Sequence, residues 1–370
     1  MSALDPVILS EVNKVASAVA KGAASIIGMA SQFPSTKPLL QLGSTEWLRS
    51  GVIAPRDNYP LVPDYLTLLG PSFGESDNGT LPAPVGIASV AVFGSLVVVS
   101  TTADTTYVSK DGGITLTLAS GVQSQTVFEA NGFIYASSGS NLRRTANGDT
   151  WQVCSGISST LSGIAFKGGI YVATTIASES VSWVSTNGLA FTGYNITVLG
   201  SSAKNSVCAV NGFFLMGPSG SVAGPLISYD GVTWALVTLV AGSTLNVHCV
   251  LAAGDKAVAF TTLGIFETVD GFSWVKTGAL QSGFNINSGY PKCFYSDGLI
   301  GILSSSDILL CNHLSSFSAY TFASGVPAAA ISGGCLVGGS RTAGTMFYRR
   351  KLNRFVGSPK FVDGLYYRVK

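Results

Sequence analysis

The side chains best suited to acid–base chemistry in this chain are carboxylates that lie far apart in the sequence. Glu129, Glu179 and Glu267 each fall in a different segment. Two carboxylates that converge on a cleft can hydrolyse a glycosidic bond, one as the acid and the other as base or nucleophile. The spacing alone does not bring these three together, so glycan hydrolysis stands as the alternative interpretation.

The arginines and histidines give catalysis little support. An enzyme that binds an acidic sugar needs several arginines around the substrate carboxylate. The chain has nine, none between Arg144 and Arg341: Arg49, Arg56, Arg143, Arg144, Arg341, Arg349, Arg350, Arg354 and Arg368. Its two histidines, His248 and His313, accompany no nucleophile in a recognised arrangement. We therefore expect a protein that is not an enzyme and that carries no cofactor.

The cysteines are typical of a packed core rather than of a metal site. Cys208, Cys249 and Cys293 are 41 and 44 residues apart, so they take similar places in a repeated unit. Buried small thiols are common in cores. No Cys-x-x-Cys pair or Cys/His cluster is present, so the sequence does not indicate a metal site. We expect reduced core thiols; adjacent blades could place two of them near each other, but a disulfide needs tighter geometry than a repeat supplies.

These side chains are carried by a repeat whose clearest feature is a short turn. Asp-Gly or Asn-Gly between alternating apolar runs is a strong hairpin signal, because the central residues must tolerate positive φ. Copies span residues 109–115, 145–151, 185–191, 228–234 and 268–274, with degenerate copies at 311–317 and 349–355. A second glycine turn lies 14 to 17 residues before each copy. A strand-rich repeat of about 40 residues predicts an all-β propeller of seven or eight four-stranded blades.

Within each copy, particular residues are expected to build the turn and to pack beside it. The turn formers are Asp111, Asn147, Asn187, Asp230 and Asp270, and the aromatic residues that follow include Trp151, Trp234 and Trp274. We interpret them as structural, because Asp and Asn side chains bind nearby backbone amides.

The overall charge excludes an electrostatic role in binding nucleic acid. Charged residues make up 11% of the chain, hydrophobic residues 46%, and the net charge is +2. No basic run is present. A protein that binds nucleic acid through phosphates needs a basic surface.

Residues 1–33 are predicted to form an N-terminal helix with a narrow apolar seam. The seam includes Ile8, Val12, Val15, Val19 and Ile26, spaced by three, four or seven residues. We expect it to dock on a partner or to oligomerise; packing on the propeller's own side is the alternative. The segment predicts neither a signal peptide nor a membrane span, because it contains the charged residues Asp5, Glu11, Lys14 and Lys21.

The remaining parts are an extended, Pro-rich connector over residues 34–83, the propeller over 84–356 and a closing strand over 357–370. Pairing of this last segment with the segment around Trp47 would build an eighth blade from both ends of the chain. Seven blades are favoured only narrowly over eight.

Two short motifs lie outside the repeats. The first is Trp47-Leu48-Arg49-Ser50-Gly51 followed by Tyr59-Pro60, and the second is the ending Gly364-Leu365-Tyr366-Tyr367. Both resemble motifs of bacteriophage tail and virion-appendage proteins. The repeated turns resemble the Asp-box of sialidases, shortened by one residue between Asp and Gly; that box is structural.

The resemblance implies a structural protein of a phage virion, at a neck, tail or fibre position, assembled in the host cytoplasm. Its partners would be other virion proteins, or further copies of itself, docked through the helix and Trp47. Contact with a host surface glycan is a further expectation. The competing reading is a sialidase-like or depolymerase propeller enzyme.

Overall fold

The computed structural model describes residues 85–279, with gaps at 178–179, 199–203, 219–222 and 241–244, and, with short gaps, residues 292–353. Strands at 46–49, 52–55, 72–79 and 366–368 are also described. The helix expected over residues 1–33, with its docking residues, lies outside the described residues. The chain divides into two compact units, residues 70–354 and residues 1–69 with 355–370.

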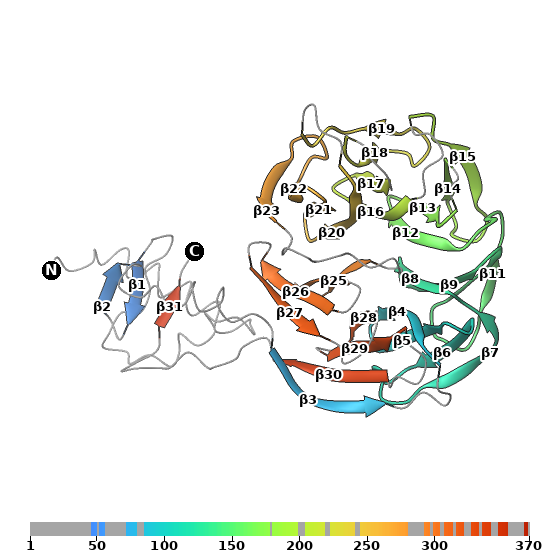
Figure 1. The fold of residues 1–370 in the computed structure, drawn as a ribbon, viewed down its shortest axis with the longest axis horizontal. Helices are drawn as coiled ribbons and strands as arrows, with labels where there is room; N and C mark the ends of the chain where they lie inside the picture. Colours follow the sequence, from blue (N-terminus) through green and yellow to red (C-terminus); the bar gives the residue numbers. More distant parts are fainter. Residues whose placement is uncertain are drawn as a thin grey trace, which may run out of the picture. The chain divides into compact units, whose positions relative to one another are not determined.

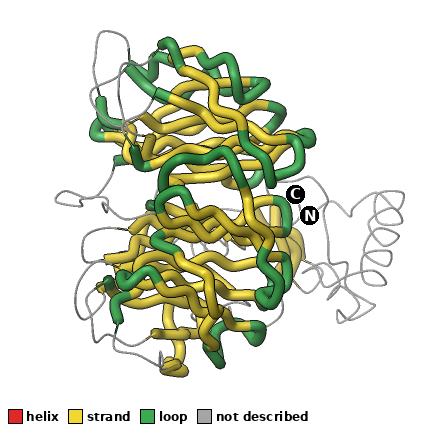
Figure 2. The backbone as a smooth tube through the Cα atoms, turned by 90° about the vertical axis from the view of Figure 1, so that its right-hand side faces the viewer, coloured by secondary structure: helices red, strands yellow, loops and turns green. Residues whose placement is uncertain are grey.

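The described part of the larger unit consists of strands and loops, without a helix (Figure 2). Its sheets stand side by side around a centre (Figure 1). This arrangement confirms the predicted all-β propeller fold.

Six of its sheets are each built from four consecutive antiparallel strands. From the innermost strand outward, the first three comprise β4 (Ile87–Phe93), β5 (Leu96–Thr101), β6 (Thr105–Ser109) and β7 (Thr117–Gln123); β8 (Thr126–Ala130), β9 (Phe133–Ser138), β10 (Asn141–Thr145) and β11 (Gln152–Cys154); and β12 (Leu161–Lys167), β13 (Ile170–Thr175), β14 (Val181–Ser185) and β15 (Thr192–Asn195). The next three comprise β16 (Lys204–Val210), β17 (Phe213–Pro218), β18 (Leu226–Ser228) and β19 (Ala235–Leu236); β20 (Val247–Ala253), β21 (Lys256–Thr261), β22 (Gly264–Thr268) and β23 (Val275–Gly278); and β24 (Cys293–Ser296), β25 (Leu299–Leu303), β26 (Asp307–His313) and β27 (Ser316–Thr321).

A further four-stranded sheet combines strands from opposite ends of the chain. It contains β28 (Pro327–Ser332), β29 (Cys335–Ser340), β30 (Phe347–Asn353) and β3 (Ser72–Gly79). β3 pairs antiparallel with β30, from Ser72 opposite Asn353 to Gly79 opposite Phe347. The propeller unit therefore takes in residues that the sequence analysis assigned to the connector.

The composite sheet also corrects the last predicted turn. The degenerate copy at 349–355 predicts a hairpin turn at Lys351 and Leu352, but both residues lie inside β30. Neither residue favours positive φ, so the strand continues and its outer neighbour comes from β3 instead. The preceding degenerate copy does hold a hairpin, since His313 in β26 lies opposite Ser316 in β27.

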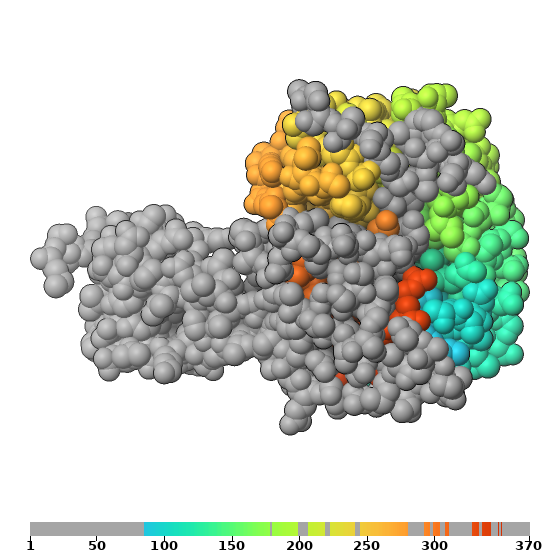
Figure 3. Space-filling view, viewed as in Figure 1, coloured from blue at the N-terminus to red at the C-terminus, as the bar shows by residue number. Residues whose placement is uncertain are grey.

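Apolar side chains hold neighbouring sheets together. Second strands such as β5 are buried along their whole length, whereas the outermost strand β15 is exposed throughout. One core cluster joins Val97 of β5 to Val337 and Phe347 of the composite sheet. In Figure 3 red atoms from the last part of the described chain adjoin cyan atoms from its first part. Burial between sheets, rather than within one, therefore closes the ring.

The smaller unit contains a three-stranded sheet in the order β2 (Val52–Pro55), β1 (Glu46–Arg49) and β31 (Tyr366–Arg368). Trp47 of β1 lies opposite Arg368 of β31. The two ends of the chain do pair here, as the sequence allowed. They form three strands, however, and not the four-stranded eighth blade considered above.

Candidate functional site

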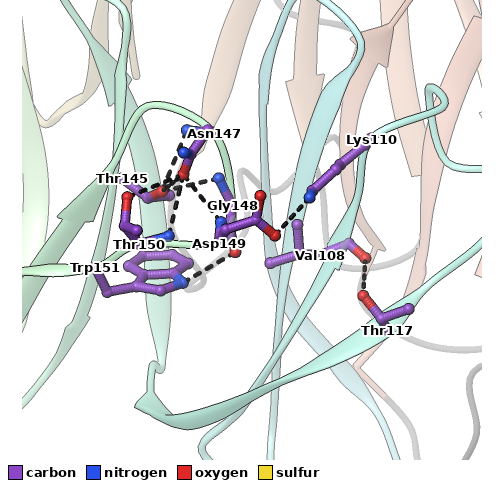
Figure 4. A network of polar contacts seen from close by, with 9 residues as sticks. All are labelled: Val108, Lys110, Thr117, Thr145, Asn147, Gly148, Asp149, Thr150 and Trp151. Carbon is purple, nitrogen blue, oxygen red and sulfur yellow. Dashed lines mark hydrogen bonds and ion pairs between the residues drawn. The ribbon is translucent and has the colours of Figure 1, made fainter.

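The repeated turns between the third and fourth strands form a recurring polar structure, seen in the second sheet in Figure 4. The Thr145 hydroxyl accepts the N–H of Gly148 at 2.8 Å. Asn147 Oδ1 accepts the N–H groups of Asp149 at 3.0 Å and Thr150 at 3.1 Å. The indole N–H of Trp151 donates to the Gly148 carbonyl at 3.3 Å. The turn thus satisfies its own backbone groups with side chains.

The same bonds recur in the later turns. Asp230 Oδ1 accepts the N–H groups of Val232 and Thr233, and Asp270 Oδ1 accepts those of Phe272 and Ser273. Asn187 does the same for Leu189 and Ala190. The indoles of Trp234 and Trp274 each donate at 3.0 Å to the carbonyl of the turn glycine. These four turn formers therefore bind backbone groups within their own turns.

The first turn is one residue longer than the others. Asp111 Oδ1 accepts from Ile114 and Thr115, three and four residues ahead, and the Ser109 hydroxyl accepts from Gly113 at 2.7 Å. Gly113, and not Gly112, therefore occupies the place of the glycine in the later copies. This turn keeps the residue between Asp and Gly that the other four lack.

These hydrogen bonds favour the ionised aspartates. Hydrogen bonds from the Ser109 and Thr115 side chains hold the pKa of Asp111 well below its usual range. Backbone N–H groups of Ser273 and Phe272 do the same for the pKa of Asp270. At Asp230 partial burial opposes ionisation, but the N–H groups of Thr233 and Val232 outweigh it and lower the pKa.

The turn glycines also pack directly against the preceding sheet. Gly231 has a φ of +75°, and a Cβ there would clash with the Val172 side chain of β13. Gly271, with φ of +82°, faces Ile227 of β18 in the same way. Glycine is required at these places by the backbone conformation and by the close approach of the neighbouring sheet.

Side chains at the tips of neighbouring turns contact one another. Lys110 of the first turn forms an ion pair with Asp149 of the second at 2.5 Å (Figure 4). Tyr229 of the fourth turn meets Phe272 of the fifth, with ring centroids 6.5 Å apart. In each pair, the second residue of one turn meets the residue that follows the glycine of the next. Alignment of the repeats is the only signal that would have identified these contacts.

A central cavity of about 650 Å³ is lined by the innermost strands of the ring. Its wall is mostly apolar, with a few polar or charged side chains that include Glu129, Ser162, Ser206 and Lys292. Glu129 is exposed, and its carboxylate accepts the Gly132 N–H at 3.0 Å. The protein around the carboxyl excludes part of its water, and this desolvation raises the pKa of Glu129. The hydrogen bond from Gly132 acts in the opposite direction.

The carboxylates considered for hydrolysis are not assembled in the described part of the ring. Glu129 lines the cavity, whereas Glu267 lies on the third strand of its sheet and forms an ion pair with Lys256 at 2.9 Å. Glu179 lies outside the described residues. Glu129 and Glu267 therefore do not face each other across one cleft.

Two of the residues considered for catalysis, Arg144 and His248, are enclosed by the ring to different degrees. Arg144 is 7% exposed, donates to Asn187 O and Gln152 Oε1, and lies 4.1 Å from the centre of the Phe133 ring. His248 is half-buried, and burial and the Lys292 charge lower its pKa. Arg144 thus links two sheets rather than facing a substrate.

The five described cysteine side chains are free and buried. Cys249 and Cys293 belong to one core cluster of neighbouring sheets, as the repeat positions predicted. Burial raises the pKa of Cys249, and the thiol of Cys293 acts in the same direction. Among the described residues, no group of three His, Cys, Asp or Glu side chains could hold a metal ion.

Of the residues expected to dock a partner, Trp47 lies in β1 and the others lie outside the described residues. The described residues contain no helix that is long and apolar enough to cross a membrane.

Comparison with known proteins supports the fold and goes no further. No family model matches the chain, and no curated protein matches it in sequence. Among solved structures, a computationally designed protein named Ika8 is 12% identical with a TM-score of 0.52, covering 74% of this chain and all of the designed one. YCF48 from Cyanidioschyzon merolae is 12% identical with a TM-score of 0.52, covering 75% of this chain and 99% of its own.

The extracellular domain of the putative one component system BT4673 from B. thetaiotaomicron is 10% identical with a TM-score of 0.55. This likeness covers 75% of the present chain and 40% of that one. At such low identity, these similarities concern the propeller fold alone.

Proposed function

We propose that this chain is a non-catalytic structural component of a tailed-phage virion, at the neck, tail or fibre. The pairing of β1 with β31 carries the proposal. The Trp47 motif and the Gly-Leu-Tyr-Tyr ending each resemble virion proteins, and the register joins them directly, with Leu48 opposite Tyr367 and Arg49 opposite Tyr366. Both motifs belong to a unit other than the ring. This separation supports a docking role for the ends of the chain.

In this proposal the composite sheet is the seventh blade and closes the ring. The helix expected over residues 1–33 docks on other virion proteins or on further copies of the chain, through Ile8, Val12, Val15, Val19 and Ile26. In this proposal the helix attaches the ring to the virion. A host surface glycan is a further partner. The separation of Glu129 from Glu267 supports a non-catalytic ring.

The test is incorporation into particles of the phage that encodes the chain. A version lacking residues 1–33 should remain soluble and folded by circular dichroism, yet be missing from purified particles, whereas the full chain is found there by mass spectrometry. Absence of the full chain from particles would overturn the virion assignment. Equal incorporation of both versions would overturn docking through residues 1–33.

The competing enzyme has its own observable outcome. If the purified chain released sugar from host surface glycans, and if Glu129→Gln stopped that release, the ring would be catalytic. We expect no release from either version.

A further inference from the structure

Two buried thiols from neighbouring sheets lie beside each other in the ring. Cys249 lies in β20 and Cys293 begins β24, and both belong to one core cluster. The Cys293 thiol donates to the carbonyl of Val250, the residue after Cys249, with Sγ 3.8 Å from the oxygen. The Cys249 thiol shares a side-chain hydrogen bond with Cys293. The two sulfur atoms are therefore within hydrogen-bonding reach of each other.

The origin of this pair in two packed sheets suits a bridging ion better than a disulfide. β20 and β24 belong to different sheets and share no hydrogen-bond ladder. A disulfide holds its two Cα atoms about 4.4–6.8 Å apart, close to the spacing of paired strands, which is about 4.7–4.9 Å. Packed sheets stand farther apart, because side chains fill the space between them. A metal ion replaces one sulfur–sulfur bond by two bonds of about 2.3 Å each.

The available ligands decide which kind of ion could bind. Thiolates are soft ligands and favour soft cations such as Cu(I), whereas a structural zinc site needs four ligands. The described residues contain no group of three His, Cys, Asp or Glu side chains that could hold a metal ion. Cys208 of β16 also lines the cavity, but it does not complete such a group. Two sulfur ligands in a line are sufficient for Cu(I) or for its heavier analogue Ag(I).

Lys292 supplies a charge that matches such a complex. It directly precedes Cys293, is half-buried and lines the central cavity together with Cys293. Burial raises the pKa of Cys249, and the charge of Lys292 acts in the opposite direction. Cu(I) held by two thiolates has one net negative charge, which a cation stabilises strongly where water is excluded. The cavity, of about 650 Å³, brings an entering ion to Cys293.

We propose that Cys249 and Cys293 bind one Cu(I) ion between their sulfur atoms, beside Lys292 at the wall of the central cavity. The ion replaces the proton of each thiol, so that two protons are released and no electron is transferred. The sequence gives no local sign of this pair, because the cysteines lie 44 residues apart and become neighbours only in the ring. The site uses residues of the ring alone and does not depend on the virion proposal.

Competition with the Cu(I) chelator bicinchoninate, on the full chain and without oxygen, tests the site. We expect one ion per chain, counted by native mass spectrometry. Cys249→Ser and Cys293→Ser should each weaken binding by more than about 100-fold, because residues beyond the ligands account for about 10–100-fold. Lys292→Gln should weaken it about tenfold, because it removes the charge and keeps both sulfur ligands.

Cys154→Ser is the matched control, because Cys154 is a free, buried thiol in another core cluster; binding should not change. Cys208→Ser should also leave binding unchanged. Near-ultraviolet circular dichroism checks that each variant is folded, and Lys292→Gln keeps the test open if a serine variant unfolds. Ag(I), which air does not oxidise, repeats the measurement in air.

Four results would overturn the proposal. These are no binding of either ion, undiminished binding by Cys249→Ser or Cys293→Ser, loss of binding in Cys208→Ser, and a disulfide between Cys249 and Cys293 in place of the ion. Undiminished binding by Lys292→Gln would overturn the part assigned to its charge.

Discussion

At the scale of single residues, each turn needs three chemical groups, and different amino acids supply them. A Ser or Thr hydroxyl binds the glycine N–H, an Asp or Asn oxygen binds the next two N–H groups, and glycine takes positive φ. Asn147 and Asn187 make the same bonds as Asp230 and Asp270. The negative charge is therefore not needed for the geometry, but it does add a dependence on pH.

That dependence has a defined sign. The pKa values of Asp111, Asp230 and Asp270 lie below the ordinary value of 3.8 in the folded protein. The ionised groups therefore contribute stability that is present above about pH 4 and is lost as the pH falls through the folded pKa. Asp230→Asn and Asp270→Asn should lose stability relative to wild type at pH 7, and the difference should shrink toward pH 2.

Urea unfolding of both variants at pH 7, 4, 3 and 2 measures this effect. The natural turn at Asn147 shows that asparagine fits the geometry, so the comparison isolates the charge. A difference from wild type that stays constant across this range would contradict the assigned pKa directions.

The glycine contacts give a second prediction at this scale. Gly231 and Gly169 have similar φ values, +75° and +83°, but only Gly231 lies against a neighbouring side chain, that of Val172. Gly169→Ala should cost about 1–2 kcal/mol for the left-handed backbone alone. Gly231→Ala should cost about 1–3 kcal/mol more, because the added methyl group overpacks the contact between sheets. Equal losses in chemical denaturation would argue against that contact.

At the scale of elements, β3 supplies the outermost strand of the composite sheet. A chain of residues 70–354 keeps β3 and should unfold cooperatively, close to the melting temperature of the full chain. A chain of residues 84–354 lacks β3, which leaves the edge of β30 unpaired. We expect its melting temperature to be at least about 5 °C lower, with self-association through the free edge.

Scanning calorimetry and size-exclusion chromatography compare the two truncated chains directly. The same stability and the same elution volume for both would show that β3 is dispensable for the stability of the ring.

The sequence predicted the repeated hairpins well and the closing strand poorly, for a physical reason. Inner strands such as residues 96–101 are apolar and buried, so their pattern is strong. Residues 72–79 read Ser-Phe-Gly-Glu-Ser-Asp-Asn-Gly, with a single apolar side chain and no alternation. Outer strands need little burial on either face, so a pattern search based on hydrophobicity misses them.

The residues of the candidate site also differ in how well the sequence predicted them. The turn formers could be identified because Asp-Gly and Asn-Gly pairs carry their signal locally. In the first turn, Gly112 and Gly113 are consecutive, so the sequence did not show which of them takes the place of the glycine in the later turns. Glu129 and Lys292 are brought to one cavity only by the ring, since nothing in their local sequence links them.

At the scale of the whole molecule, the chain is organised by pairings between its two ends. β3 pairs with β30 in the ring, and β1 pairs with β31 in the smaller unit. Both pairings join strands that only tertiary structure could bring together. The hydrophobic pattern favoured the repeats, and it could not specify which early segment would return to the last sheet.

The composite sheet also bears on how such a chain is made. During synthesis β3 leaves the ribosome long before β30, yet its partner is Asn353 and the residues before it. The nascent chain must therefore carry an unmatched strand while the intervening sheets form one after another. Pairing between such distant segments is slow, so the final maturation step can occur only after translation has all but ended. Until then β3 is the unpaired strand at which a chaperone would act and aggregation would begin.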